Sequence, residues 1–111
     1  MNVISDEYMK DMIAKTQRYT LVILKASSNI SMPGAEKMIW EHARRNFALR
    51  SEGVISIVCP VADGSDVTGV AIFNAEPEKV KSTMDEDPAV KEGIFTYEIH
   101  PCRSFPGDTL P

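Results

Sequence analysis

Four runs of branched and apolar residues alternate with two helical segments and one short turn, and this order restricts the fold of the 111-residue chain. Runs rich in Val, Ile, Tyr and Phe are typical of strands, whereas apolar residues spaced three and four apart are typical of helices. The order along the chain is strand, helix, strand, strand, helix, strand. The strand runs are 19–27, 54–60, 66–74 and 94–100, and the helical runs are 35–50 and 77–84.

The connections between these segments carry turn signals. Asp63-Gly64 stands between two of the strand runs and predicts a hairpin. Pro77 opens the second helix in its first turn, where the missing N–H costs nothing. Asp87 precedes Pro88 and restarts the helix for one turn, which Gly93 closes before the last strand.

This order predicts an α+β protein with the ferredoxin-like βαββαβ arrangement, in which both helices cover one face of a four-stranded antiparallel sheet. A chain of this length forms a single domain, 1–111, with its core at about 19–101. An extra amphipathic helix is expected at 5–17, because Tyr8, Met9, Met12 and Ile13 recur at helical spacing. Residues 102–111 are proline-rich and are expected to form an extended arm.

The strands are apolar on both of their alternating faces, as "TLVILKA" shows. Since the helices cover one face only, the other face also needs a cover. The simplest cover is the same face of a second copy, which would give a homodimer of the dimeric α+β barrel type. The N-terminal helix or the C-terminal arm could also cover this face within one chain.

Composition excludes several classes of protein. The net charge of −4 argues against nucleic acid as a partner, because binding phosphates needs a basic surface. No run approaches the roughly 20 apolar residues of a membrane span, and acidic residues stand where a secretion signal needs a basic flank. Cys59 and Cys102 have no metal-ligand spacing, so free thiols, no metal site and a cytoplasmic location are expected.

His42 lies at the border of the apolar stripe of the first core helix, which contains Met38, Ile39, Ala43, Phe47 and Leu49. It can be a half-buried side chain whose polar atoms are satisfied. It can also be a general acid or base, a role that histidine fills most often because it titrates near neutral pH.

Three further residues are candidates for a site. Asp87 is an N-cap by its position before Pro88, and it can also be one half of an active site. Glu98 and His100 share the polar face of the last strand, which would look into the space between two sheets. Polar side chains there fit a wet or ligand-binding space, so both are candidates for substrate binding, although His100 can also be an ordinary strand-end side chain near the tail.

At these residues the chain resembles the YCII-related family of small bacterial proteins. The shared features are His42 on the first core helix, Gly53 eleven positions later, a strand ending in "CP", a hairpin and "DPAVKEGIF". The resemblance covers about 19–101 and implies the fold of the dimeric α+β barrels, which include muconolactone isomerases and small monooxygenases. It also implies a catalytic pair of His42 and Asp87 in a pocket. The N-terminal helix, the loop "SNISMPG" and the C-terminal tail depart from the family pattern.

The resemblance and the two residues predict a small enzyme that uses acid–base chemistry without a cofactor, as an isomerase or a lyase. Its expected partners are a second copy and a small metabolite, with aromatic or hydroxylated compounds as first candidates. A cofactor-free monooxygenase is a neighbouring possibility. The alternative is a non-catalytic dimeric module that binds a small ligand or another protein. A His42–Asp87 pair facing a cavity with room for a substrate would favour the enzyme.

Overall fold

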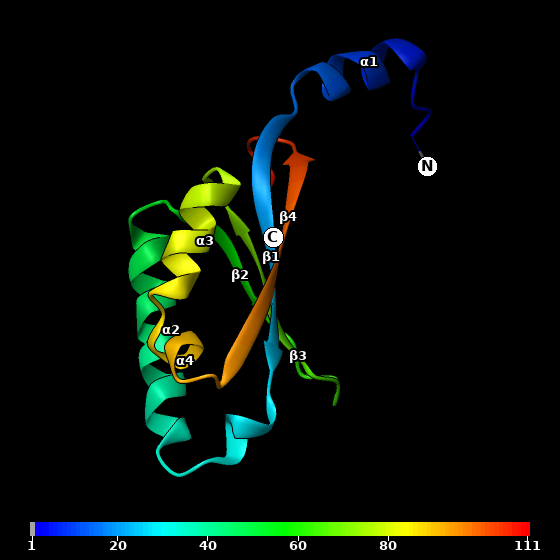
Figure 1. The fold of residues 1–111 in the computed structure, drawn as a ribbon. Coiled ribbons are helices and arrows are strands. Elements are labelled where there is room, and N and C mark those ends of the chain that lie inside the picture. Colours follow the sequence, from blue (N-terminus) through cyan, green and yellow to red (C-terminus); the bar gives the residue numbers. More distant parts are fainter. Residues whose placement is uncertain (1) are drawn as a thin grey trace.

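A computed structural model describes residues 2–111 of the chain (Figure 1). It contains four strands, four α-helices and one short 3-10 helix. In chain order these are α1 (Asp6–Ala14), β1 (Gln17–Ala26), η1 (Ser28–Ser31), α2 (Ala35–Ser51), β2 (Ile55–Pro60), β3 (Val67–Phe73), α3 (Pro77–Asp85), α4 (Pro88–Lys91) and β4 (Phe95–Ser104). None of the helices within residues 2–111 has the length and apolar character that crossing a membrane would need.

The four strands form one sheet in the order β2-β3-β1-β4, and every neighbouring pair is antiparallel. Helices α2, α3 and α4 lie on one face of this sheet, while α1 projects from the start of β1 toward the other side (Figure 1). The predicted ferredoxin-like fold with an additional N-terminal helix is confirmed.

The hydrophobic core lies between the sheet and the three covering helices. Alternate residues of β1 (Thr20, Val22 and Leu24) are buried on this face, as the two-residue period of a strand requires. Ile55, Phe73 and Phe95 contribute from the other strands, and Val80, Met84 and Ala89 contribute from α3 and α4. The one polar strand residue among them, Thr20, donates its hydroxyl hydrogen bond to the Ala75 carbonyl at 2.7 Å, so its burial leaves no unpaired group.

The opposite face of the sheet carries a second set of apolar side chains. Leu21 and Ile23 of β1 point to this face and are only half-buried. Their neighbours in register are Ile72 and Val70 of β3, which are also half-buried and apolar. The prediction that the strands are apolar on both faces is therefore confirmed. We call this surface, with Leu21, Ile23, Ile57, Val70 and Ile72, the open face.

Two predicted boundaries are wrong, and they share one cause. The predicted helix 5–17 ends at Ala14, and the predicted arm 102–111 is in strand β4 as far as Ser104. Gln17 and Arg18 pair with Ser104 and Arg103, so that each segment supplies the backbone hydrogen-bond partners of the other. β4 is an edge strand, where a proline such as Pro101 is tolerated.

One predicted core residue of α2 is also misplaced. Phe47 was expected in the buried stripe, but 65% of its surface is exposed. The side of α2 that faces the core instead carries Ala35 and His42, the two buried residues of this helix. His42 therefore lies deeper than the border position that its spacing predicts, with 8% of its surface exposed.

Candidate active site

Helix α2 places His42 against the sheet. The imidazole ring lies edge-on to the ring of Phe95 in β4, with 5.0 Å between the ring centroids and 64° between the planes. Because this contact joins α2 to β4, packing between the helix and the sheet fixes the orientation of the imidazole ring.

Asp87 is positioned by the short turn that follows it. Its Oδ1 atom accepts hydrogen bonds from the backbone N–H groups of Ala89 at 2.9 Å and Val90 at 3.4 Å. Pro88 occupies the first position of α4, and Gly93, with φ of 71°, allows the chain to leave the turn for β4. Asp87 is thus an N-cap, and it is 1% exposed.

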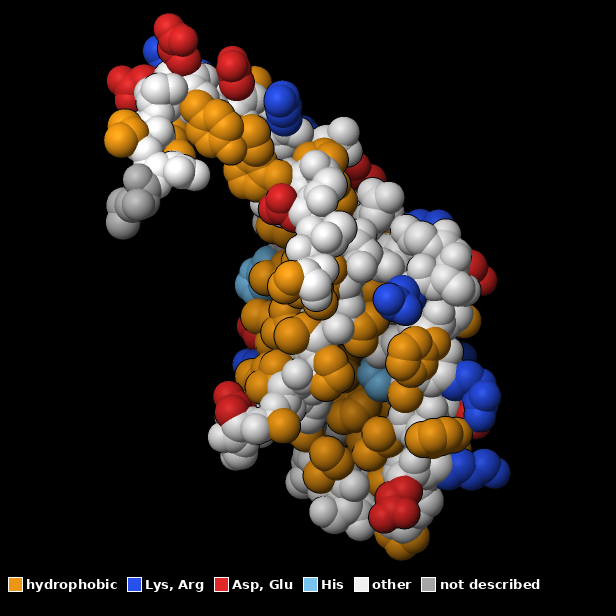
Figure 2. Space-filling view, turned by 180° about the vertical axis from the view of Figure 1, so that it is seen from behind, with side chains coloured by type: hydrophobic (Ala, Val, Ile, Leu, Met, Phe, Trp, Pro, Cys, Tyr) orange, Lys and Arg blue, Asp and Glu red, His pale blue; other side chains and the backbone are white. Residues whose placement is uncertain are grey.

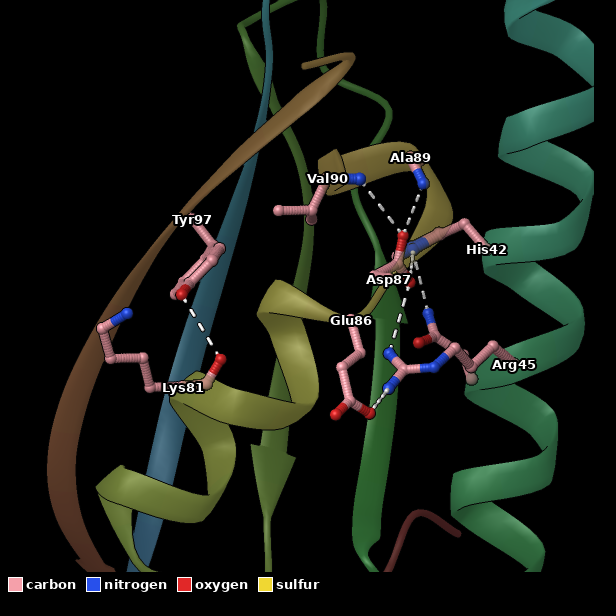
Figure 3. Close-up of polar contacts among 9 residues, drawn as sticks. His42, Arg45, Lys81, Glu86, Asp87, Ala89, Val90 and Tyr97 are labelled. Carbon is pink, nitrogen blue, oxygen red and sulfur yellow. Dashed lines mark hydrogen bonds and ion pairs between the residues drawn. The ribbon is translucent and has the colours of Figure 1, made fainter. Parts of the chain in front are cut away.

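The other oxygen of Asp87 contacts His42. The distance between Nδ1 of His42 and Oδ2 of Asp87 is 2.7 Å, so the predicted contact between the two residues is confirmed (Figure 3). Nη1 of Arg45 lies 3.7 Å from the same oxygen and brings a positive charge to the buried carboxylate. One carboxylate therefore caps a helix with one oxygen and holds the imidazole with the other.

Burial is the largest single influence on the Asp87 carboxyl group and raises its pKa. The hydrogen bond and the charge of His42 lower the pKa, as do the hydrogen bonds from the N–H groups of Ala89 and Val90. Together these contacts lower the pKa by more than burial raises it. The net pKa of Asp87 lies below its ordinary value. Because the ionised carboxylate only accepts hydrogen bonds, Nδ1 of His42 must be the donor.

The second nitrogen of His42 contacts a residue that is not among the predicted site residues. Nδ2 of Asn46 lies 3.2 Å from Nε2 of His42. With the proton of a neutral imidazole on Nδ1, Nε2 carries a lone pair and accepts a hydrogen bond from Asn46. The signal for Asn46 was present in the sequence, since a polar residue four positions after His42 lies on the same helix face.

His42 and Asn46 both line a cavity of about 340 Å³ between α2 and the strands β2 and β3. The rest of the lining is almost entirely apolar, and it includes Leu24, Ile39, Ile55, Phe73, Met84 and Phe95. In Figure 2, which shows the molecule from behind, the hollow beside α2 is surrounded by hydrophobic side chains with a histidine among them. Phe47 and Ile30 also line the cavity and are exposed, so they lie at its mouth.

The other two predicted site residues lie elsewhere. Glu98 and His100 project from β4 on the side of Ile23 and Leu21, which is the open face. Glu98 pairs with Lys25 at 3.2 Å, and Nε2 of His100 lies 4.0 Å from its carboxylate. The sheet therefore separates these residues from the His42 cavity. No three His, Cys, Asp or Glu side chains within residues 2–111 are grouped so that they could hold a metal ion.

No protein-family model and no curated protein matches this sequence. Among solved structures, the chain is similar to the 5-chloro-2-hydroxyhydroquinone dehydrochlorinase from Burkholderia phenoliruptrix AC1100 in complex with 2,5-dihydroxybenzoquinone. The match covers 74% of this chain and 90% of that chain, with 22% sequence identity and a TM-score of 0.51. At this identity the likeness is one of fold.

Proposed function

We propose that this protein is a small cytoplasmic enzyme of the YCII-related family that performs acid–base chemistry with His42 and Asp87, without a cofactor. The observation that carries the proposal is His42 on the wall of an apolar cavity, hydrogen-bonded to the buried Asp87 behind it. A titratable pair beside a cavity with few other polar groups is the arrangement that acid–base catalysis needs.

Each residue has its own role in the proposed reaction. Nε2 of His42 removes a proton from a C–H or O–H group of the substrate, and Asp87 stabilises the imidazolium that forms. In an elimination the imidazolium then passes this proton to a basic leaving group, or to solvent when chloride leaves as the anion. In an isomerisation it returns the proton to another atom of the substrate. The contact with Asn46 fixes the orientation of the imidazole beside the cavity.

Cavity size and lining indicate the substrate class. An apolar cavity of about 150 Å³ already accepts benzene, so 340 Å³ leaves room for one substituted ring. The fold neighbour acts on a chlorinated, hydroxylated aromatic compound, as its name states. A single hydroxylated ring is the substrate class that we propose for this chain.

We also propose that two copies assemble through the open face as a dimeric α+β barrel. The half-buried Leu21, Ile23, Val70 and Ile72 form an apolar surface that water would otherwise cover. In this dimer Glu98 and His100 face the space between the two sheets. Their predicted role in ligand binding therefore concerns that space and not the His42 cavity.

The test is a turnover assay with a panel of small hydroxylated aromatic compounds, beginning with 5-chloro-2-hydroxyhydroquinone. Chloride release and the ultraviolet spectrum report elimination, and proton NMR reports isomerisation. We expect at least one compound to be converted by the purified chain. Compounds that bind in the cavity without any conversion would support the alternative function, a ligand-binding module.

A further inference from the structure

Helix α1 presents an apolar surface to solvent. No residue of α1 is buried, and Tyr8, Met9 and Ile13 are 53%, 49% and 59% exposed. These residues recur on one face of the helix, so they form a continuous stripe. Figure 2 shows hydrophobic side chains along one side of the projecting helix and acidic ones on its outer side. A helix this short is only marginally stable in water unless its apolar stripe packs against another surface.

Within residues 2–111 nothing covers this stripe, since no residue of α1 is buried. Only Lys15 and Thr16 connect α1 to β1, and Thr16 is held by Arg103 of β4. The guanidinium of Arg103 donates to Thr16 Oγ1 at 3.0 Å and to the Thr16 carbonyl at 3.2 Å. Helix α1 thus points away from the body, on the side of the open face (Figure 1).

A matching surface lies on the outer side of α2. Trp40 and Phe47 are 67% and 65% exposed and stand seven positions apart, which places them on one stripe of the helix. Phe47 also lines the mouth of the His42 cavity. In Figure 2 the hydrophobic side chains beside the hollow are bordered by basic ones. We call Trp40 and Phe47 the α2 stripe.

Charge favours contact between these two surfaces over the alternatives. Helix α1 carries three acidic residues and one lysine, whereas α2 carries four basic residues and two acidic ones. Two copies of α1 would repel each other, and an acidic helix is also repelled by the anionic lipids that attract amphipathic helices. The α2 stripe is the only other pair of large exposed apolar side chains on one helix within residues 2–111.

We propose that α1 of one copy packs on the α2 stripe of a second copy and closes the mouth of its cavity. Each site would then be completed by the partner's helix, with Tyr8, Met9 and Ile13 forming part of its entrance. This inference uses the cavity and not the proposed chemistry, so either can fail without the other.

Trp40 is the single tryptophan of the chain and reports directly on this contact. The experiment measures acrylamide quenching of its fluorescence in the full-length chain. We expect Trp40 to be shielded in the wild type and at least about tenfold weaker self-association in Ile13→Asp, with Trp40 then accessible. Ala14→Asp is the matched control, because it adds the same charge at the next exposed position, off the stripe.

A mixing experiment shows whether the contact is made between copies. A Trp40→Phe chain has no tryptophan but carries an intact α1, whereas an Ile13→Asp chain carries an intact α2 stripe. Adding the first chain to the second should restore the shielding of Trp40. Met9→Asp replaces Ile13→Asp if circular dichroism shows that the latter is unfolded.

Three results would overturn the proposal. The first is quenching that is the same in the wild type, Ile13→Asp and Ala14→Asp. The second is weaker self-association in Ile13→Asp while Trp40 is fully accessible in the wild type, which would place α1 elsewhere on the partner. The third is shielding of Trp40 that appears only on adding vesicles of anionic lipid, which would make a membrane the occupant.

Discussion

Nδ1 of His42 and Oδ2 of Asp87 lie 2.7 Å apart, although 45 positions separate the two residues along the chain. The same carboxylate caps α4 through Ala89 and Val90. The fold and the candidate site therefore depend on one side chain. Packing of α2 against the sheet fixes the position of the imidazole, and the turn at Asp87-Pro88 fixes the position of the carboxylate.

Asp87→Asn tests the orienting role. Asparagine still caps α4 with its carbonyl oxygen, but its amide nitrogen faces Nδ1 of His42 and cannot accept a hydrogen bond from it. The imidazole should then hold its proton on Nε2, and turnover should fall by roughly 10²- to 10⁴-fold. Nitrogen-15 NMR of His42 checks the tautomer. Asp85→Asn is the same change at an exposed acid two positions earlier, and it should alter neither turnover nor the tautomer of His42.

Acid should remove the stabilising contribution of Asp87. Its pKa is below the ordinary value of about 3.9, so the contribution is fully present above that pH and is lost as pH falls through the lower, folded pKa. Urea unfolding should show wild type more stable than Asp87→Asn by about 1–3 kcal/mol at pH 7, with a smaller difference at pH 3. A difference that stays constant over this range would show that the pKa of Asp87 is not lowered by folding.

Asn46 is expected to act as a positioning residue. Asn46→Ala removes one hydrogen bond to Nε2 and should lower kcat by up to about tenfold with little change in KM. Asn46→Asp places a hydrogen-bond acceptor beside Nε2 and therefore stabilises a proton on this nitrogen. Because Nε2 must be free of a proton to act as the base, kcat should fall further in Asn46→Asp than in Asn46→Ala. The exposed Asn74→Ala is the control. Equal activity of the aspartate variant and the wild type would remove Asn46 from the site.

The open face should hold the dimer together. Ile23→Asp puts a charge in its centre and removes about 1.5–3 kcal/mol of apolar burial from each of the two copies, which together corresponds to about 10²- to 10⁴-fold in the dissociation constant. Sedimentation velocity measures this change. Ser82→Asp adds the same charge on α3, away from the open face, and should have no effect. A wild-type chain that is monomeric at micromolar concentration would contradict the dimer.

Local patterns predicted most of the fold because local physics determines it. The period of two in "TLVILKA" and the Asp63-Gly64 turn each describe a few neighbouring residues. The same holds for Asp87, where Pro88 and Gly93 shape the turn that buries it. The contact of Asp87 with His42 is not local, and it was predicted only from the resemblance to a family motif.

The errors concern features that depend on distant segments. Neither Gln17 nor Ser104 has a clear strand pattern, and each is in a strand because the other pairs with it. Phe47 has the helical spacing of a core residue, but a cavity separates its side of α2 from β2 and β3, so Phe47 borders the cavity mouth and stays exposed. A single-sequence pattern contains no information on which face of a helix finds a partner.

Turnover by His42→Ala, measured beside His100→Ala, tests the central claim most directly. The two histidines lie on opposite sides of the sheet, so the same substitution separates the cavity from the open face. On the first compound that the wild type converts, we predict that His42→Ala is about 10²- to 10⁴-fold slower with its fold intact by circular dichroism, while His100→Ala keeps wild-type kcat. A folded His42→Ala variant that retains wild-type kcat would contradict the assignment of His42 as the acid–base residue.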